Sequence, residues 1–543
     1  MWLQNYDPLG SPVLSTMLAG APIVVLLGLL VAGRSAPFAA VAGLMTAVLG
    51  AVYGFGMPAP QALAAAGYGA LFGLLPIGWI VLAAVFLYQL TVQTGQFEVV
   101  KRSVAALSPD RRMQALLIAF SFGSFLEGAA GFGTPVAISA ALLIGLGFSP
   151  LYAAGLSLIA NTAPVAFGAL GTPIITLAKV SGLDEMQLSQ MAGRQLPLFS
   201  LIVPAWLVAT ISGWRGVVGC WPAILVCGGT FAAAQFVISN FHGPTLVDIG
   251  GGVGSMIALS IFLRFWQPKE IWRFPDEAEP TAAAESHARL TGARVAYAWF
   301  PWVLLSTMVF LWGWPDVKQK LNEISKPSFV VPHLHQQVAR TPPIVAKTKA
   351  EEARYDVNWL SATGTGIFIA AVLTAIWLRV PPIRFVGLFA ETVWKMREAL
   401  LTIACMLALA FTTKYSGGDA TLGLAFTHTG WLYPFFAPML GWLGVALTGS
   451  DTSSNALFGS LQRITAEQLH LNPVLIVASN STGGVMGKMI DAQSIVVAAV
   501  ATGQHGGEGQ ILRFVFWHSV VLAAMVGLVT LFQAYVTPWM APS

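Results

Sequence analysis

Long apolar stretches, separated by short polar breaks, fill most of the chain. No charged side chain occurs between Arg34 and Glu98, and over residues 113–182 only Glu127 and Lys179 are charged. A run of about 20 apolar residues is long enough to cross a bilayer as a helix. The pattern therefore predicts an all-α polytopic membrane protein with about 12–14 transmembrane spans.

Two polar interruptions divide this apolar sequence into halves. A first transmembrane half covers 1–266, a second covers 357–543, and a single span at 294–314 lies between them. The polar stretches at 267–293 and 316–356 mix charges of both signs with proline. We interpret both as solvated connectors rather than domains.

Each half carries the same order of unusual features. A Gly- or Ser-rich segment with one carboxylate is followed by an apolar stretch and then by a polar break that begins at an asparagine. Non-helical backbone survives at membrane depth only where it lines a cavity or is buried in protein, and two such places in corresponding positions indicate a transporter binding site. We therefore predict two repeats, inverted relative to each other, with re-entrant hairpins near 113–147 and 448–463 and broken helices near 150–178 and 473–500.

Glu127 is the candidate proton-coupling group of the first hairpin. Gly131 and Gly133 follow it closely, and glycine lets a backbone turn and approach a ligand. A carboxylate in a desolvated site binds its proton more tightly than in water, which suits such a role. The alternative is a structural carboxylate that caps a nearby helix. We favour the functional interpretation, because ionising an acidic side chain within a membrane span is costly and such residues usually have a function there.

Asp451 is the corresponding candidate of the second hairpin. Its neighbours Thr452, Ser453, Ser454 and Asn455 are small hydrogen-bond donors. At the N-terminus of a helix such donors bind a carboxylate substrate, and they are also preferred helix caps. The two roles are compatible. We predict proton coupling for Asp451 and substrate binding for its neighbours.

The two polar breaks supply the remaining substrate-binding candidates. Unwound chain there would expose amides and carbonyls at membrane depth. The alternative is a proline or glycine kink that neighbouring helices fill. Lys488 is a nearby cation that would pair with an organic anion or with Asp451. The candidates in the breaks are Asn161, Thr162, Asn480, Ser481, Thr482, Gly483 and Lys488, and the hairpin glycines Gly131 and Gly133 join them.

His428 is a third candidate for proton coupling, because the pKa of histidine lies near neutrality. A lone histidine at a helix end is also typical of a membrane interface, and this alternative stays open.

Composition narrows the function. The chain is 56% hydrophobic and only 10% charged, and its net charge of +4 with no Lys/Arg-rich run gives no indication of nucleic acid. It contains no P-loop, no HExxH, no CxxC pair and no Asp-rich metal motif. We predict no enzymatic activity, no cofactor and no resident metal. The expected partners are a small-molecule substrate, protons and membrane lipids.

Several blocks resemble one known family nearly end to end. They are NYDP (5–8), TGQFE (94–98), FLEGAAGFG (125–133), LYAAGLSLIANTAPVAFGA (151–169), GRQLP (193–197), GWLGVALTGSDTSSNALF (441–458) and STGGVMGKMI (481–490). They make the chain similar to the bacterial lactate permeases, carriers of lactate and glycolate, and Glu127, Asp451 and Lys488 match within these blocks. The resemblance implies a multi-pass secondary carrier of the bacterial cytoplasmic (inner) membrane that takes up L-lactate, D-lactate and glycolate with protons. It also implies an ion-transporter-like fold of inverted repeats and paired hairpins.

Other functions are weighed against this one. A sodium-coupled carrier of the same architecture would use hairpin hydroxyls as sodium ligands, and a dicarboxylate carrier would require more cations than Lys488 alone. An intramembrane enzyme needs an activated nucleophile or a metal, and a channel needs an open path with several binding sites. The sequence shows no constellation for a nucleophile or a metal. A channel could use the polar breaks as a filter, and saturable turnover at carrier-like rates would exclude it.

Overall fold

The protein is described by a computed structural model that covers residues 1–32, 34–105, 108–129, 131, 133–274, 291–345, 347–504 and 507–542. The helices of its first part are α1 (Pro12–Val31), α2 (Ala36–Leu49), α3 (Ala59–Phe72), α4 (Trp79–Gln93), α5 (Gln96–Ala105), α6 (Arg111–Gln114), α7 (Gly123–Ala129), α8 (Thr134–Gly145), α9 (Pro150–Ala160), α10 (Gly168–Ser181), α11 (Glu185–Phe241) and α12 (Val247–Phe262). Those of the second part are α13 (Gly292–Gly313), α14 (Pro315–Ile324), α15 (Thr363–Trp377), α16 (Pro382–Ser416), α17 (Gly418–Phe426), α18 (Tyr433–Thr448), α19 (Asp451–Gln468), α20 (Pro473–Gly487), α21 (Ala492–Ala501) and α22 (Glu508–Tyr535).

The expected polytopic helical membrane protein is confirmed. Within the described residues, nine helices are long and apolar enough to cross a membrane, or eleven when two bent helix pairs are each counted as one span. The 57-residue α11 is interrupted at Gly213 (φ +67°). The stretches on either side run antiparallel, since Ser200 Oγ donates to Gln235 Oε1 at 2.7 Å. Each stretch is therefore a span of its own.

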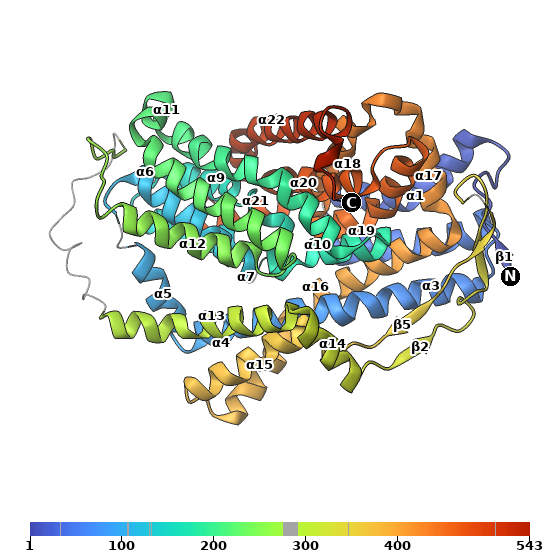
Figure 1. Ribbon diagram of the computed structural model, residues 1–543, viewed down its shortest axis with the longest axis horizontal. Coiled ribbons are helices and arrows are strands. Elements are labelled where there is room, and N and C mark those ends of the chain that lie inside the picture. The colour runs from blue at the N-terminus through green and yellow to red at the C-terminus, as the bar shows by residue number, and fades with distance from the viewer. Residues whose placement is uncertain are drawn as a thin grey trace.

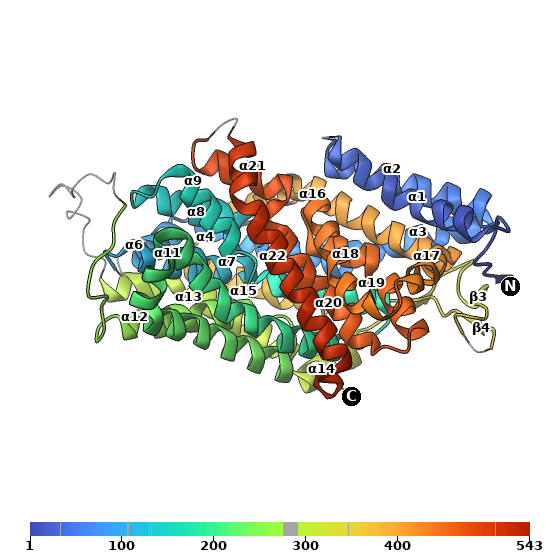
Figure 2. The same cartoon turned by 90° about the horizontal axis from the view of Figure 1, so that it is seen from above.

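The two parts of the chain interleave in space. Helix α16 packs along α3 and α2, and α15 packs against α4, so that segments from opposite ends of the sequence lie side by side (Figure 1). Helix α22 crosses over α18 and α20 (Figure 2). The halves read from the sequence are thus not separate bodies.

Both halves present a helical hairpin followed by a broken helix. In the first, helical chain from Arg111 to Ala129 is followed by α8, which packs back against it, and Gly131 and Gly133 adopt positive φ between the two limbs. In the second, α18 turns at Gly449 into α19. The segment 448–463 is thus not a hairpin by itself. It holds the turn and most of α19, and the other limb of the hairpin, α18, lies before it in the sequence.

The broken helices are confirmed, but the second break lies elsewhere than expected. Helices α9 and α10 meet at 61°, around Asn161. In the second half, α20 continues through Asn480–Gly484, and the 42° bend follows at Asp491–Ala492. The glycines serve packing instead of unwinding: a Cβ at Gly483 would lie 2.1 Å from the carbonyl oxygen of Pro438. Small residues of this kind let helix backbones approach closely in membranes.

The halves exchange contacts at these features. Helix α10, the second limb of the first broken helix, packs on α19 of the other half. Helix α21, the second limb of the second broken helix, packs on α8 of the first hairpin. Each broken helix thus reaches across to the opposite hairpin. Inversion of the two repeats stays a prediction.

The polar segment 316–356 carries more structure than a simple connector. Besides α14 it holds β2 (Ser328–Val330), β3 (Val338–Arg340), β4 (Lys349–Ala350) and β5 (Arg354–Asp356), and β3 pairs with the N-terminal β1 (Trp2–Leu3). These short strands depart from the expected all-α fold. Lys326 and Asp356 form an ion pair of 2.8 Å, and the hydrogen bond from Lys326 holds the pKa of Asp356 below its usual value. Of the connector expected at 267–293, residues 275–290 lie outside the described residues.

Candidate functional site

The two hairpins and both broken helices meet at one cavity of about 650 Å³. The first hairpin contributes Glu127, and the turn of the second contributes the run Leu447–Ser453. The start of α10, the end of α20 and helix α21 complete the inner wall, and α16 with the loop before α2 forms the mouth. Its inner polar lining consists of Glu127, Thr172, Asp451, Thr452, Ser453 and Lys488.

Glu127 is held against unwound backbone. It lies near the end of α7, is 5% exposed, and its Oε2 has no hydrogen-bond partner among the described residues. A Cβ at Gly168 would lie 2.5 Å from Glu127 Oε1, so only glycine allows this approach. The next residues, Ala169 and Leu170, adopt the left-handed region at φ +43° and +58°. Non-glycine residues are held there at a cost, and such strain clusters at functional sites.

Asp451 opens α19 and is supported from α20. It is 3% exposed, Ser481 Oγ donates to its Oδ2, and Asn455 Nδ2 lies 3.3 Å from the same oxygen. Its Oδ1 has no partner among the described groups. A Cβ at Gly484 would lie 2.3 Å from that oxygen, so this glycine makes room for the carboxyl group.

Lys488 closes the inner end of the cavity. Its Nζ donates to the carbonyl of Gly449 at 2.6 Å and lies 3.3 Å from Asp491 Oδ2. Asp491 is fully buried and caps α21 by accepting from Ser494 N at 2.8 Å. The charge of Lys488 is therefore balanced by Asp491 within the protein.

Other predicted residues support the site from behind rather than line it. Asn480 Nδ2 donates to Asn455 Oδ1 at 2.9 Å, and Gln462 Nε2 donates to Asn480 Oδ1 at 3.1 Å. Thr482 Oγ1 donates to Gln195 Oε1 at 2.7 Å. The remaining members of this group, which take part in turns, packing or local hydrogen bonds, are Gly131, Gly133, Thr162, Ser454, Ser481 and Gly483.

Asn161 is buried at the bend between α9 and α10, and neither polar atom of its side chain has a hydrogen-bond partner within the described part of the chain.

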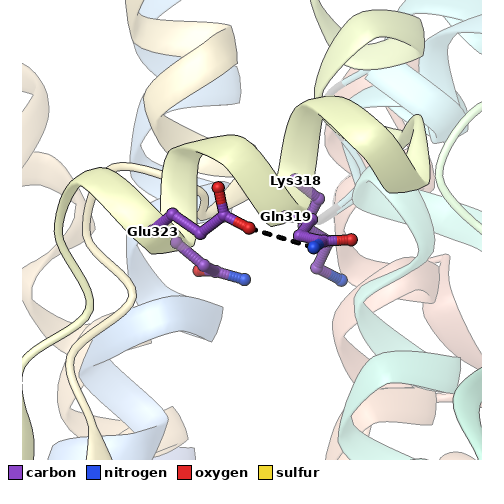
Figure 3. Close-up of a pocket in the computed structure, with 4 residues that line it drawn as sticks. Lys318, Gln319 and Glu323 are labelled. Atoms are coloured by element: carbon purple, nitrogen blue, oxygen red, sulfur yellow. Dashed lines mark hydrogen bonds between the residues drawn. The ribbon is translucent and has the colours of Figure 1, made fainter.

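His428 does not join the other candidates. It is exposed in the turn Thr427–Leu432 and borders a separate cavity with the N-terminal segment Leu3–Asp7. A further shallow concavity lies on α14, where Gln319 donates to Glu323 at 3.0 Å (Figure 3). Both side chains are exposed, as expected of two residues one turn apart on the solvated face of a helix.

Asp248 is a buried carboxylate that the sequence reasoning did not single out. It lies in the first turn of α12, 1% exposed, and packs on the helix that carries Glu127. The available signal was a lone acid at the start of the apolar segment VDIGGGVGSMIALSIF. An isolated acid in such a segment is a functional candidate by default.

The fold and this cavity define a multi-pass membrane carrier: buried carboxyl groups and helix breaks from two hairpin units surround one polar space. The chain belongs to the L-lactate permease family, whose model matches residues 15–537. The family expected from the sequence blocks is thereby confirmed, and the protein is a transporter rather than an enzyme.

Individual relatives match over the whole chain. The L-lactate permease of Salmonella typhimurium (strain LT2) is 47% identical over 100% of both chains. The glycolate permease GlcA of Escherichia coli (strain K12) is 47% identical over 98% of both. Among solved structures, MtrF of Neisseria gonorrhoeae is similar with a TM-score of 0.45 at 13% identity, over 88% of this chain and 83% of that one.

Proposed function

We propose that this carrier imports L-lactate, D-lactate and glycolate together with protons across the bacterial cytoplasmic membrane. Relatives named L-lactate permease and glycolate permease support this class of small 2-hydroxymonocarboxylates. The cavity is large enough for one such anion with water.

The charge balance of the cavity is the observation that carries proton coupling. Two buried carboxyl groups, Glu127 and Asp451, line it, and the buried cation Lys488 already faces Asp491. With both acids ionised, the inner cavity would repel an anionic substrate, and desolvated charges interact strongly. A proton on Glu127 or Asp451 removes part of that repulsion. Substrate and proton would therefore bind together.

The start of α19 is the proposed contact for the substrate carboxylate. The first backbone N–H groups of a helix have no intrahelical partner, and the helix dipole favours an anion there. Thr452 and Ser453 line the cavity at this helix end. A proton on the adjacent Asp451 would let the anion approach these donors.

The residues at the mouth of the cavity support the interpretation of this structure as an inward-facing state. Arg34 and Lys395 border it, together with Glu398. Short loops rich in Lys and Arg lie on the cytoplasmic side, so the substrate would leave into the cytoplasm in this state. Movement of one repeat against the other would open the opposite side.

Uptake by the purified protein in proteoliposomes tests the proposal. An inward proton gradient without sodium is expected to drive accumulation of labelled lactate. Because one proton with one monoanion carries no net charge, a membrane potential alone should add little. Accumulation driven equally well by a sodium gradient at constant pH would favour a sodium-coupled carrier instead. Competition by succinate as strong as by glycolate would indicate a dicarboxylate carrier.

A further inference from the structure

A second buried carboxyl group, that of Asp248, lies on a helix that packs against the helix of Glu127. Asp248 lies in the first turn of α12, outside the cavity lining, and is 1% exposed. Neither of its carboxyl oxygens accepts a hydrogen bond from any described residue. A buried charge is normally paired, so a buried carboxyl group without a partner calls for an explanation.

Two glycines bring this group to the first hairpin. A Cβ at Gly128 would lie 2.7 Å from the Cβ of Asp248, and a Cβ at Gly252 would lie 2.5 Å from the backbone nitrogen of Phe125. One glycine on each helix therefore lets α7 and α12 touch backbone to backbone. Glu127 precedes Gly128, so its carboxyl group is carried by the same helical turn that contacts Asp248.

No cation among the described residues balances Asp248. The elements packed on α12 are α7, α10, α11 and the helical stretch Ala115–Phe122, and among their charged residues Glu127 is the one next to the contact with Asp248. Glu127 in turn lines the cavity together with Asp451 and Lys488.

The surroundings contain further unpaired polar groups. Ser124 lies one helical turn before Glu127, is buried, and its Oγ has no partner within the described chain. Asn161 is 2% exposed with both side-chain polar atoms unpaired among the described residues. These donors and acceptors make the region polar although none of them lines the substrate cavity.

We propose that Asp248 and Glu127 form a carboxyl pair that shares the coupling proton, with Asp248 holding it away from the substrate. This inference rests on the proposed proton symport. Two desolvated carboxyl groups on helices in backbone contact cannot both ionise at low cost, so the pair retains a proton that moves between a Glu127 carboxyl oxygen and a carboxylate oxygen of Asp248. Because α12 does not line the cavity, Asp248 can release the proton by a route separate from that of the anion.

The test compares net uptake with exchange in proteoliposomes. Asp248→Asn mimics a permanently protonated group. Lactate counterflow, which needs no proton release, is expected to stay within about twofold of the unaltered protein, while uptake driven by a proton gradient falls at least about a hundredfold, the low end of what a proton-transfer group contributes. Ser255→Ala, a buried site two turns further along α12, is the matched control and should leave both assays unchanged.

The outcomes separate this inference from the proposed function. Failure of the unaltered protein to use a proton gradient would refute proton symport itself. If the unaltered protein uses the gradient and Asp248→Asn shows the same uptake and pH profile, only the role of Asp248 is refuted. Loss of counterflow together with uptake in a folded variant would also refute it. If Asp248→Asn does not fold, Asp248→Glu is expected to transport with a shifted pH midpoint, and an unshifted midpoint would overturn the proposal.

Discussion

Asn455, in the hairpin of the second half, donates a hydrogen bond of 3.1 Å to the carbonyl of Pro173 in the broken helix of the first half. The same amide nitrogen lies 3.3 Å from Asp451, and the amide oxygen accepts from Asn480 at 2.9 Å. One buried side chain therefore connects the two halves with a carboxyl group of the cavity.

Replacing Asn455 with leucine should destabilise the protein. The Asn480 amide nitrogen would lose its partner inside the protein, a loss that costs roughly 1–3 kcal/mol for a buried group, and the Pro173 carbonyl would lose its bond to the other half. We expect a lower midpoint of thermal unfolding in detergent. Ser260→Ala is the control, because Ser260 donates only within α12, to Met256. An Asn455→Leu protein that melts like the unaltered one would show that this connection contributes nothing.

Lys488 and Asp491 should behave as a coupled pair. Lys488→Met leaves the fully buried Asp491 without its cation, and breaking a buried pair from one side costs about 3–5 kcal/mol. Asp491→Asn in the same protein removes the stranded charge and keeps an oxygen that can accept from Ser494 N. We expect the double variant to recover much of the lost thermal stability. A double variant as unstable as Lys488→Met would mean that Lys488 acts through Gly449 rather than through Asp491.

The membrane spans, the family, the first broken helix and the acids of the cavity were all predictable from the sequence. Glu127 and Asp451 stand out because an acid in an apolar run rarely has a purely structural role. Asn161 marks the first break because Pro164, Gly168 and Gly171 follow it within a few residues. These signals are local, and local signals are what a sequence shows directly.

The remaining features depend on contacts between distant segments. Gly483 and Gly484 suggest unwound chain when only the sequence is considered, yet in the structure they make room for Pro438 and for Asp451. A glycine that permits a bend and a glycine that permits close packing look the same in sequence. Asp248 is linked to Glu127 only once α12 is known to lie on α7, and His428 is set apart only by the position of its turn.

Gly168→Ala should impair transport because it displaces Glu127, and not because it strains the backbone. Gly168 has a φ of −60°, which alanine also adopts, but the new Cβ would lie 2.5 Å from Glu127 Oε1. Displacing a site group by about an ångström can cost roughly a hundredfold in rate, so we expect lactate uptake to fall strongly while the protein stays folded. Gly67→Ala meets no atom within 4 Å and is the matched control. Recovery by the shorter side chain in Gly168→Ala/Glu127→Asp would confirm the steric cause, and normal uptake by Gly168→Ala would contradict the close contact.

Glu127→Gln should separate the proton from the substrate. The amide keeps the size of the side chain and cannot release a proton, so it resembles the protonated acid beside Gly168 and Asn161. Lactate should still bind and exchange across the membrane, whereas accumulation driven by a proton gradient should fall by at least about a hundredfold, as expected when a proton-transfer group is removed. Asp451→Asn, measured in the same two assays, identifies which of the two acids carries the proton. If Glu127→Gln accumulates lactate normally and Asp451→Asn exchanges without accumulating it, the coupling site lies at α19, and both Glu127 and its partner Asp248 lose their proposed role.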